Sequence, residues 1–133
     1  MIVDTSALLA IARGEVDAQR YSLAIERSRD ISISAGTLFE ASIVADRSGD
    51  PLVSRLFDQI VRESGANTQP VTAEQARIAR EAYRDFGKGS GHPAGLNFGD
   101  CFAYALAKER NEPLLYKGDG FAQTDIRSAL EQV

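Results

Sequence analysis

The amino-acid sequence predicts an α/β domain in which helices cover both faces of a short, mainly parallel sheet, a three-layer α/β/α arrangement. Short apolar or alternating segments recur along the chain between longer segments whose apolar residues have helical spacing. This interleaving is typical of strand–helix units that build a parallel sheet between two layers of helices. The length of 133 residues suits one domain, and neither a repeat nor a linker divides the sequence. We therefore expect a single domain over residues 1–133.

The strands of this sheet are expected in four short segments. Residues 31–34 alternate apolar and polar side chains with a period of two, which is the clearest strand pattern in the chain. Residues 1–3 and 113–116 are short apolar runs that end at polar or glycine-rich segments, and residues 67–71 are a further candidate. Because helical segments separate all four, the strands are predicted to run mainly parallel.

Helices are expected wherever apolar residues recur at three- and four-residue spacing. The predicted segments are residues 5–12, 16–28, 37–47, 52–61, 72–86 and 97–110. Thr72 and Gln75 have the spacing of a capping box that opens the fifth of them. A glycine-rich loop, residues 87–95, separates the fifth helix from the sixth.

Composition places the chain among ordinary globular proteins, with 44% hydrophobic and 26% charged residues. Cys101 is the only cysteine, which excludes an internal disulfide and matches a reducing compartment. No apolar run approaches the ~20 residues that span a bilayer, and residues 1–12 lack a basic leader. We therefore expect a cytoplasmic protein without a membrane partner. The formal net charge of −4 means that a polyanion partner needs a local basic patch or a bound cation.

Four acids are placed where a sheet of this kind binds its ligands. Asp4, Glu40 and Asp119 lie just beyond predicted strands, and Asp100 begins the helix that leads to the last strand. Ligands of open α/β sheets bind outside the carboxyl ends of the strands, so these side chains can converge there. Other roles are open as well. Asp4 can cap the first helix, Glu40 can complete a capping box with Thr37, and Asp100 can stabilise a first helical turn.

Convergence of these carboxylates predicts a bound cation. Two carboxylates ~6 Å apart repel by roughly 3 kcal/mol at an effective dielectric constant of ~20, so several such pairs are costly when no cation balances them. Carboxylate oxygens and water suit Mg²⁺ or Mn²⁺. The sequence has no cluster of His or Cys residues that would favour zinc.

Four segments together resemble the PIN-domain ribonucleases, and more narrowly the VapC-type toxins of bacterial toxin–antitoxin pairs. The segments are Ile-Val-Asp-Thr-Ser-Ala-Leu at 2–8, Glu40 after an alternating strand, Asn-Phe-Gly-Asp-Cys-Phe-Ala-Tyr-Ala-Leu-Ala at 97–107, and Leu-Leu-Tyr-Lys-Gly-Asp-Gly-Phe at 114–121. The resemblance runs in order from residue 1 to about residue 127. It implies a sandwich of helices about a parallel sheet, divalent-metal-dependent RNA cleavage, a cognate VapB-type antitoxin and a homodimer.

The resemblance also assigns site residues. The four acids that match the family's catalytic positions are Asp4, Glu40, Asp100 and Asp119. Asp4 and Asp100 are expected to hold one or two Mg²⁺ ions, with Mn²⁺ as a substitute, so that a bound water is activated and the oxygens at phosphorus are clamped. Glu40 and Asp119 are expected to assist. Thr5 and Ser6 match small hydroxyl residues near the metal, although Ser6 can equally serve the first helical turn.

A basic track is predicted beside Asp100. Arg77, Arg80 and Arg84 recur at helical spacing and lead to Lys88 in the glycine-rich loop. Arg80, Arg84 and Lys88 are therefore candidate RNA contacts, since basic side chains position phosphates. The alternative is a solvated helix face on which these arginines are balanced by neighbouring acids, namely Glu74, Glu81 and Asp85.

Three other functions share parts of this pattern. A receiver-like phosphoacceptor also has an acid at a strand end and a lysine after a late strand, but it uses neighbouring acids after its first strand, and Asp4 has none beside it. A haloacid-dehalogenase-type phosphatase needs a second acid two residues after the nucleophile, where this chain has Ser6. A non-catalytic binding module stays open and predicts no Mg²⁺-dependent nuclease activity.

Overall fold

The computed structural model describes residues 1–131. Within that range the strands are β1 (Ile2–Val3), β2 (Ser32–Ser34), β3 (Asn67–Gln69) and β4 (Leu114–Leu115). The helices are α1 (Thr5–Ala12), α2 (Ala18–Arg27), α3 (Ala35–Asp46), α4 (Pro51–Ser64), α5 (Ala73–Phe86) and α6 (Asp100–Arg110). Two 3₁₀ turns, η1 (Phe121–Gln123) and η2 (Ala129–Glu131), follow the last strand.

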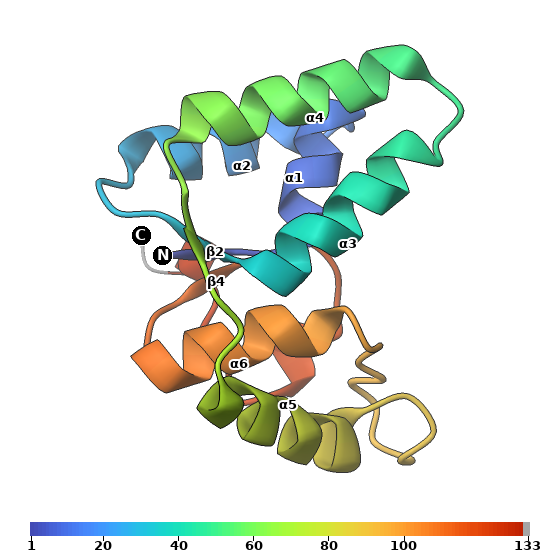
Figure 1. The fold of residues 1–133 in the computed structure, drawn as a ribbon, viewed down its shortest axis with the longest axis vertical. Helices are drawn as coiled ribbons and strands as arrows, with labels where there is room; N and C mark the ends of the chain where they lie inside the picture. The colour runs from blue at the N-terminus through green and yellow to red at the C-terminus, as the bar shows by residue number, and fades with distance from the viewer. Residues whose placement is uncertain (132–133) are drawn as a thin grey trace.

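All four strands run parallel, in the order β3-β2-β1-β4. Ile2 pairs with Ser32 on one side and with Leu114 on the other, so β1 lies in the interior of the sheet. Figure 1 shows α1 to α4 on one side of the strands and α6 with α5 on the other. The predicted three-layer α/β fold with a short parallel sheet is confirmed.

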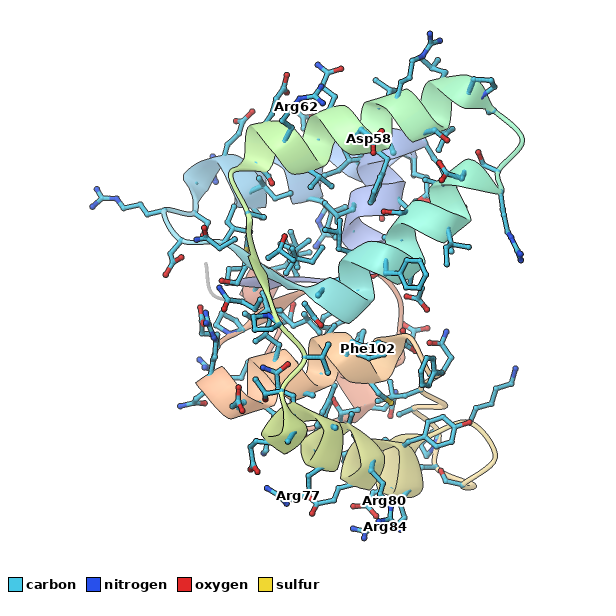
Figure 2. The ribbon with its side chains drawn as sticks, viewed as in Figure 1. Asp58, Arg62, Arg77, Arg80, Arg84 and Phe102 are labelled. Carbon is cyan, nitrogen blue, oxygen red and sulfur yellow. The ribbon has the colours of Figure 1, made fainter. Side chains whose placement is uncertain are left out.

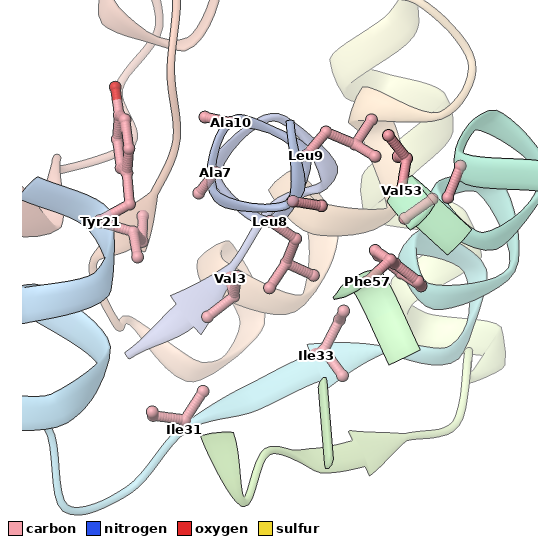
Figure 3. Packing of buried hydrophobic residues seen from close by; sticks show 14 residues of the cluster. Val3, Ala7, Leu8, Leu9, Ala10, Tyr21, Ile31, Ile33, Val53 and Phe57 are labelled. Carbon is pink, nitrogen blue, oxygen red and sulfur yellow. The ribbon is translucent and has the colours of Figure 1, made fainter. Parts of the chain in front are cut away.

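Two hydrophobic clusters lie on the two faces of the sheet. Val3, Ile33 and Leu115 belong to the cluster that also contains the buried side of α1 and part of α4. Figure 3 shows this cluster, with Val3 and Ile33 below α1 and Phe57 of α4 beside them. Ile2 and Leu114 belong to the other cluster, together with α6. Because successive strand residues point to opposite faces, the two-residue strands β1 and β4 each contribute to both clusters.

The helix boundaries follow from local capping. At α4, the Asp50 carboxylate accepts a hydrogen bond from the backbone N–H of Leu52, Pro51 occupies the first turn, and Gly65 ends the helix with a φ of 67°. At α5, Thr72 accepts from the backbone N–H of Gln75, as the capping-box spacing predicts. The other half of that box does not form, because the Gln75 side chain donates to Glu109 of α6. Among residues 1–131, no helix is long and apolar enough to cross a membrane.

Candidate active site

Asp4 lies between β1 and α1 and caps the helix. Its Oδ2 atom accepts hydrogen bonds from the backbone N–H of Ser6 at 3.1 Å and from the Ser6 hydroxyl at 2.6 Å. The side chain is 2% exposed, and its other oxygen, Oδ1, has no hydrogen-bond partner among the described residues. The capping role is therefore real but uses only one of the two oxygens. A buried oxygen without a donor is costly and is commonly explained by a missing ligand, ion or water.

Ser6 connects Asp4 to the segment that follows β4. Its hydroxyl donates to Asp4 and accepts from the backbone N–H of Lys117 at 2.9 Å. The position of the Asp4 carboxylate thus depends on two neighbouring parallel strands, β1 and β4, and not on α1 alone.

Glu40 reaches the site from α3, and its predicted capping role is wrong. The hydroxyl of Ser34, the last residue of β2, accepts from the backbone N–H of Gly36 at 3.2 Å and caps the helix. Thr37 therefore already lies inside the first turn and cannot be the cap that a Thr-x-x-Glu box requires. The Glu40 carboxylate instead accepts a hydrogen bond from the hydroxyl of Thr5 at 3.0 Å. Thr5 thus holds Glu40 across the gap between α1 and α3.

Asp100 is held by a reciprocal pair of hydrogen bonds with Asn97. The Asn97 side chain accepts from the backbone N–H of Asp100 at 2.8 Å, and Oδ2 of Asp100 accepts from the backbone N–H of Asn97 at 2.9 Å. This is the geometry of a capping box with Asn97 at the cap, so residues 97–99 form a turn that leads directly into α6. The regular helix starts at Asp100, three residues after the predicted start. Oδ1 of Asp100 receives no hydrogen bond from the described residues.

Asp4, Glu40 and Asp100 form one electrostatic group, here named the acid cluster. Burial raises the pKa of Asp4 to about 6; the two hydrogen bonds from Ser6 oppose this rise, and the charges of Asp100 and Glu40 add to it. Burial also raises the pKa of Glu40, and the Asp100 charge raises it further. The pKa of Asp100 is raised by burial against the lowering effect of the Asn97 backbone bond. The structure therefore brings three predicted site residues together as partly or fully buried like charges. Such an arrangement perturbs pKa values at functional sites.

Asp119 is not among the charges that act on the pKa values of the acid cluster. It is exposed on the turn after β4 and lines a shallow hollow together with Asp17, Arg20 and Tyr21. None of the three acids of the cluster lines that hollow. A role for Asp119 in catalysis stays a prediction.

The acid cluster offers only oxygen donors to a ligand. Among residues 1–131, no three His, Cys, Asp or Glu side chains are arranged to enclose a metal ion. Mg²⁺ does not require such an enclosure, since it keeps several waters and binds through one or two carboxylates and the phosphates of a substrate. The free Oδ1 atom of Asp4 and the all-carboxylate donor set therefore fit a hydrated Mg²⁺ or Mn²⁺ ion better than Zn²⁺, which takes nitrogen and sulfur ligands.

Comparison with known proteins identifies the family of this fold and site. The PIN domain model matches residues 1–127. The chain belongs to the PIN domain family. The resemblance predicted from four sequence segments is thus confirmed over nearly the whole chain.

Relatives of this PIN domain include VapC proteins. Ribonuclease VapC28 of Mycobacterium tuberculosis is 52% identical over 132 residues, which cover 99% of each chain. Ribonuclease VapC42 of the same species is 50% identical over 129 residues, covering 97% of this chain and 98% of VapC42. The crystal structure of M. tuberculosis VapC20, a toxin that cleaves the sarcin–ricin loop, matches with a TM-score of 0.71. That match covers 94% of this chain and 95% of VapC20 at 17% identity, so it supports the fold alone.

Lys117 of this PIN domain forms two ion pairs that the sequence did not predict. Its Nζ atom lies 2.9 Å from a carboxylate oxygen of Glu15 and 2.9 Å from one of Asp17. Both acids belong to the segment between α1 and α2, about 100 residues earlier in the chain. No local sequence pattern predicts a contact over that separation. The one available signal was that a lysine directly follows a predicted strand.

The predicted basic track lies on the outer side of α5. Figure 2 shows Arg77, Arg80 and Arg84 projecting from α5 on the side away from α6. Arg77 and Arg84 form ion pairs with acids of the same helix, namely Glu74, Glu81 and Asp85. Arg80 and Lys88 have no ion pair within residues 1–131. For Arg77 and Arg84, these ion pairs favour the alternative of a solvated helix face whose basic charges are neutralised by acids of the same helix.

An apolar groove of about 280 Å³ lies between α5 and α6. Its walls include Tyr83, Phe98 and Phe102, and the rings of Phe98 and Phe102 meet edge to face. Phe98 is 76% exposed and precedes Asp100 by two residues. This PIN domain therefore presents an exposed aromatic surface near the acid cluster, which is typical of a surface that another molecule covers.

Proposed function

We propose that this protein is a Mg²⁺-dependent endoribonuclease that acts as the toxin of a type II toxin–antitoxin pair. The observation that carries the proposal is the acid cluster, in which three partly or fully buried carboxylates have raised pKa values and one buried oxygen lacks a donor. Such a cluster suits metal-assisted hydrolysis of a phosphodiester. Membership of the PIN domain family and relatives named VapC ribonucleases support the choice of RNA as the substrate.

In the proposed mechanism, Asp4 and Asp100 hold the metal ion. When bound, Mg²⁺ supplies a water of lowered pKa and neutralises charge on the phosphate oxygens. Ser6 keeps Oδ2 of Asp4 occupied and so leaves Oδ1 available as a ligand. Glu40, oriented by Thr5, accepts the proton of the attacking water, a task that suits a carboxylate of raised pKa. Asp119 is the most exposed of the four proposed acids and assists. No covalent intermediate on the protein is needed.

The proposed RNA contacts are Arg80 and Lys88, with Arg84 in a weaker role. Arg80 and Lys88 have no ion pair among the described residues, so their charges are available to phosphate. Arg84 shares its charge with Asp85 and offers less. In a chain of net charge −4, these side chains and the metal ion together provide the attraction that an RNA backbone requires.

We further propose that the protein acts in the cytoplasm, as a homodimer, and that a cognate VapB-type antitoxin inhibits it. The VapC relatives support the antitoxin partner. Exposed aromatic side chains such as Phe39, Phe98 and Tyr83 support protein partners in general, since single domains rarely leave an apolar surface of this kind uncovered.

The alternative of a receiver-like phosphoacceptor is disfavoured by Lys117. The lysine after the last strand would have to serve Asp4, but its ammonium group is bound to Glu15 and Asp17. Labelling of Asp4 by acetyl phosphate would restore that alternative.

The deciding experiment compares Asp100→Asn with Asp58→Asn. Asp58 is an exposed acid on α4, and Figure 2 shows it in the upper part of the molecule, on the opposite side of the sheet from α5 and α6. Purified protein is incubated with total RNA in Mg²⁺, in Mn²⁺ and with a chelator. Wild type and Asp58→Asn should cut RNA only when the metal is present, and Asp100→Asn should lose at least about 100-fold in rate. Cleavage by Asp100→Asn at the wild-type rate would refute the mechanism. Wild type that never cuts RNA and never arrests growth would indicate a non-catalytic binding module.

A further inference from the structure

The carboxylate of Glu40 lies directly against the Cα atom of Gly99. A Cβ atom added to Gly99 would stand 1.4 Å from Oε2 of Glu40, 2.0 Å from Cδ and 2.4 Å from Oε1. The three nearest atoms to that added carbon all belong to Glu40. The space next to Gly99 is therefore filled by this one carboxylate.

The backbone of Gly99 gives no reason for a glycine. Its φ of −65° and ψ of −36° are right-handed helical values that every amino acid adopts readily. Alanine is favoured over glycine in such a conformation, because glycine loses more freedom when it becomes ordered. At these helical angles the glycine gains nothing from its conformational freedom, and its closest contacts, all with the Glu40 carboxylate, give the reason for it.

We infer that Gly99 is a positioning residue for Glu40: its missing side chain forms a seat that holds the carboxylate between α1, α3 and α6. The Thr5 hydroxyl of α1 binds Oε1 of Glu40 at 3.0 Å, and Oε2 lies over Gly99 just before α6. The functional part of this inference rests on the proposed role of Glu40 in RNA cleavage. The seat itself is a statement about packing that can be tested separately.

Gly36 provides the matched control, since it too is a glycine at a close approach without a positive φ. A Cβ atom there would stand 2.4 Å from the ring of Phe102, so Gly36 makes room for packing between α3 and α6. Gly36→Ala should lower the melting temperature, because the ring has to move. That effect should be the same whether or not Glu40 is present.

The test is a double-mutant cycle of wild type, Gly99→Ala, Glu40→Ala and the double variant. Thermal unfolding is measured with a chelator, and cleavage is measured in Mg²⁺. In the Glu40→Ala background, Gly99→Ala should raise the melting temperature by about 2–4 °C, since alanine replaces glycine in an emptied space. In the wild-type background that gain should be lost or reversed. In cleavage, each single variant should lose about 100-fold in kcat, and the double variant should be no slower than Glu40→Ala.

The outcomes separate the seat from the proposed function. The inference would be overturned if Gly99→Ala changed the melting temperature equally in the wild-type and the Glu40→Ala backgrounds. This test does not depend on nuclease activity. The inference would also be overturned if Glu40→Ala had a reduced kcat while Gly99→Ala kept the wild-type kcat. The ribonuclease proposal would stand in that case. If Glu40→Ala cut RNA normally but the thermal cycle were coupled, the seat would exist and the catalytic role of Glu40 would fail.

Discussion

Two groups of acids meet the segment after β4, and they are balanced in opposite ways. One is the acid cluster, whose Asp4 is linked through Ser6 to the backbone N–H of Lys117. The other, here named the paired acids, consists of Glu15 and Asp17, which bind the ammonium group of the same Lys117. The hydrogen bond from Lys117 lowers the pKa of Asp17, whereas burial raises the pKa of Asp4 to about 6.

The difference lies in where the compensating positive charge comes from. The paired acids are partly exposed and have their cation within the chain, so they have little remaining attraction for another. The acid cluster contains like charges in a drier environment, and none of its pKa shifts arises from a basic residue. A proton or a cation from solution can balance it, and we therefore expect the two groups to respond differently to pH, metal and substitution.

The largest difference in stability is expected from neutralising one acid of each group. Asp4 has a pKa of about 6 in the folded chain against an ordinary value of 3.8, which corresponds to about 3 kcal/mol of destabilisation once the group is charged. The folded state binds this proton more tightly than the unfolded state, so metal-free wild type should lose stability as the pH rises from about 4 to about 6. Asp4→Asn should lack that loss and should be the more stable protein at pH 7.5, by up to about 3 kcal/mol.

Asp17→Asn should behave in the reverse sense, because the lowered pKa of Asp17 contributes stability that is present at neutral pH and is lost as the pH falls through its folded pKa. Urea unfolding in the presence of a chelator measures both variants, over a pH range that extends from pH 8 to well below pH 4, because the folded pKa of Asp17 lies below its ordinary value of 3.8. If Asp4→Asn were less stable than wild type at every pH, the charge of Asp4 would not destabilise the folded protein, and this prediction would be wrong.

A slightly smaller effect is expected from metal binding. Mg²⁺ or Mn²⁺ at a hundred times its dissociation constant stabilises the folded protein by about 2.7 kcal/mol if it binds only that state. Wild type and Asp17→Asn should therefore show a rising melting temperature during a Mn²⁺ titration. Asp4→Asn should show a much smaller rise, and the wild-type rise should shrink at pH 5, where protons compete for the carboxylates. A flat titration of wild type would remove the metal from the proposed mechanism.

Much of the fold could be predicted because it depends on local patterns. Residues 31–34 alternate with a period of two and contain β2, and the segment 5–12 coincides with α1. The ends of elements were less predictable, because they depend on which residues find partners. Residues 113–116 read as a strand, but only Leu114 and Leu115 pair with β1.

The acid cluster could be predicted for a topological reason, and its supporting contacts could not. Asp4 and Glu40 follow parallel strands whose carboxyl ends share one edge, so their approach follows from the chain order. The Thr37–Glu40 spacing suggested a local cap, but the hydroxyl at the end of β2 performs that role. The contact of Glu40 with Thr5 joins residues 35 positions apart, and no sequence pattern specifies it. The same is true of the contact between Glu40 and Gly99.

The smallest effect is expected at Lys117, which is linked to both groups of acids. Lys117→Met removes the ammonium group from Glu15 and Asp17 but keeps the backbone N–H that binds Ser6. The ion pairs are about one-third exposed, and exposed pairs of this kind are worth about 0–1 kcal/mol. Lys117→Met should therefore lose little stability and keep the Mn²⁺-dependent rise in melting temperature, while Ser6→Ala should reduce that rise. If Lys117→Met abolished metal binding as completely as Asp4→Asn, the two groups of acids would act as one site, and the ammonium group would be part of it.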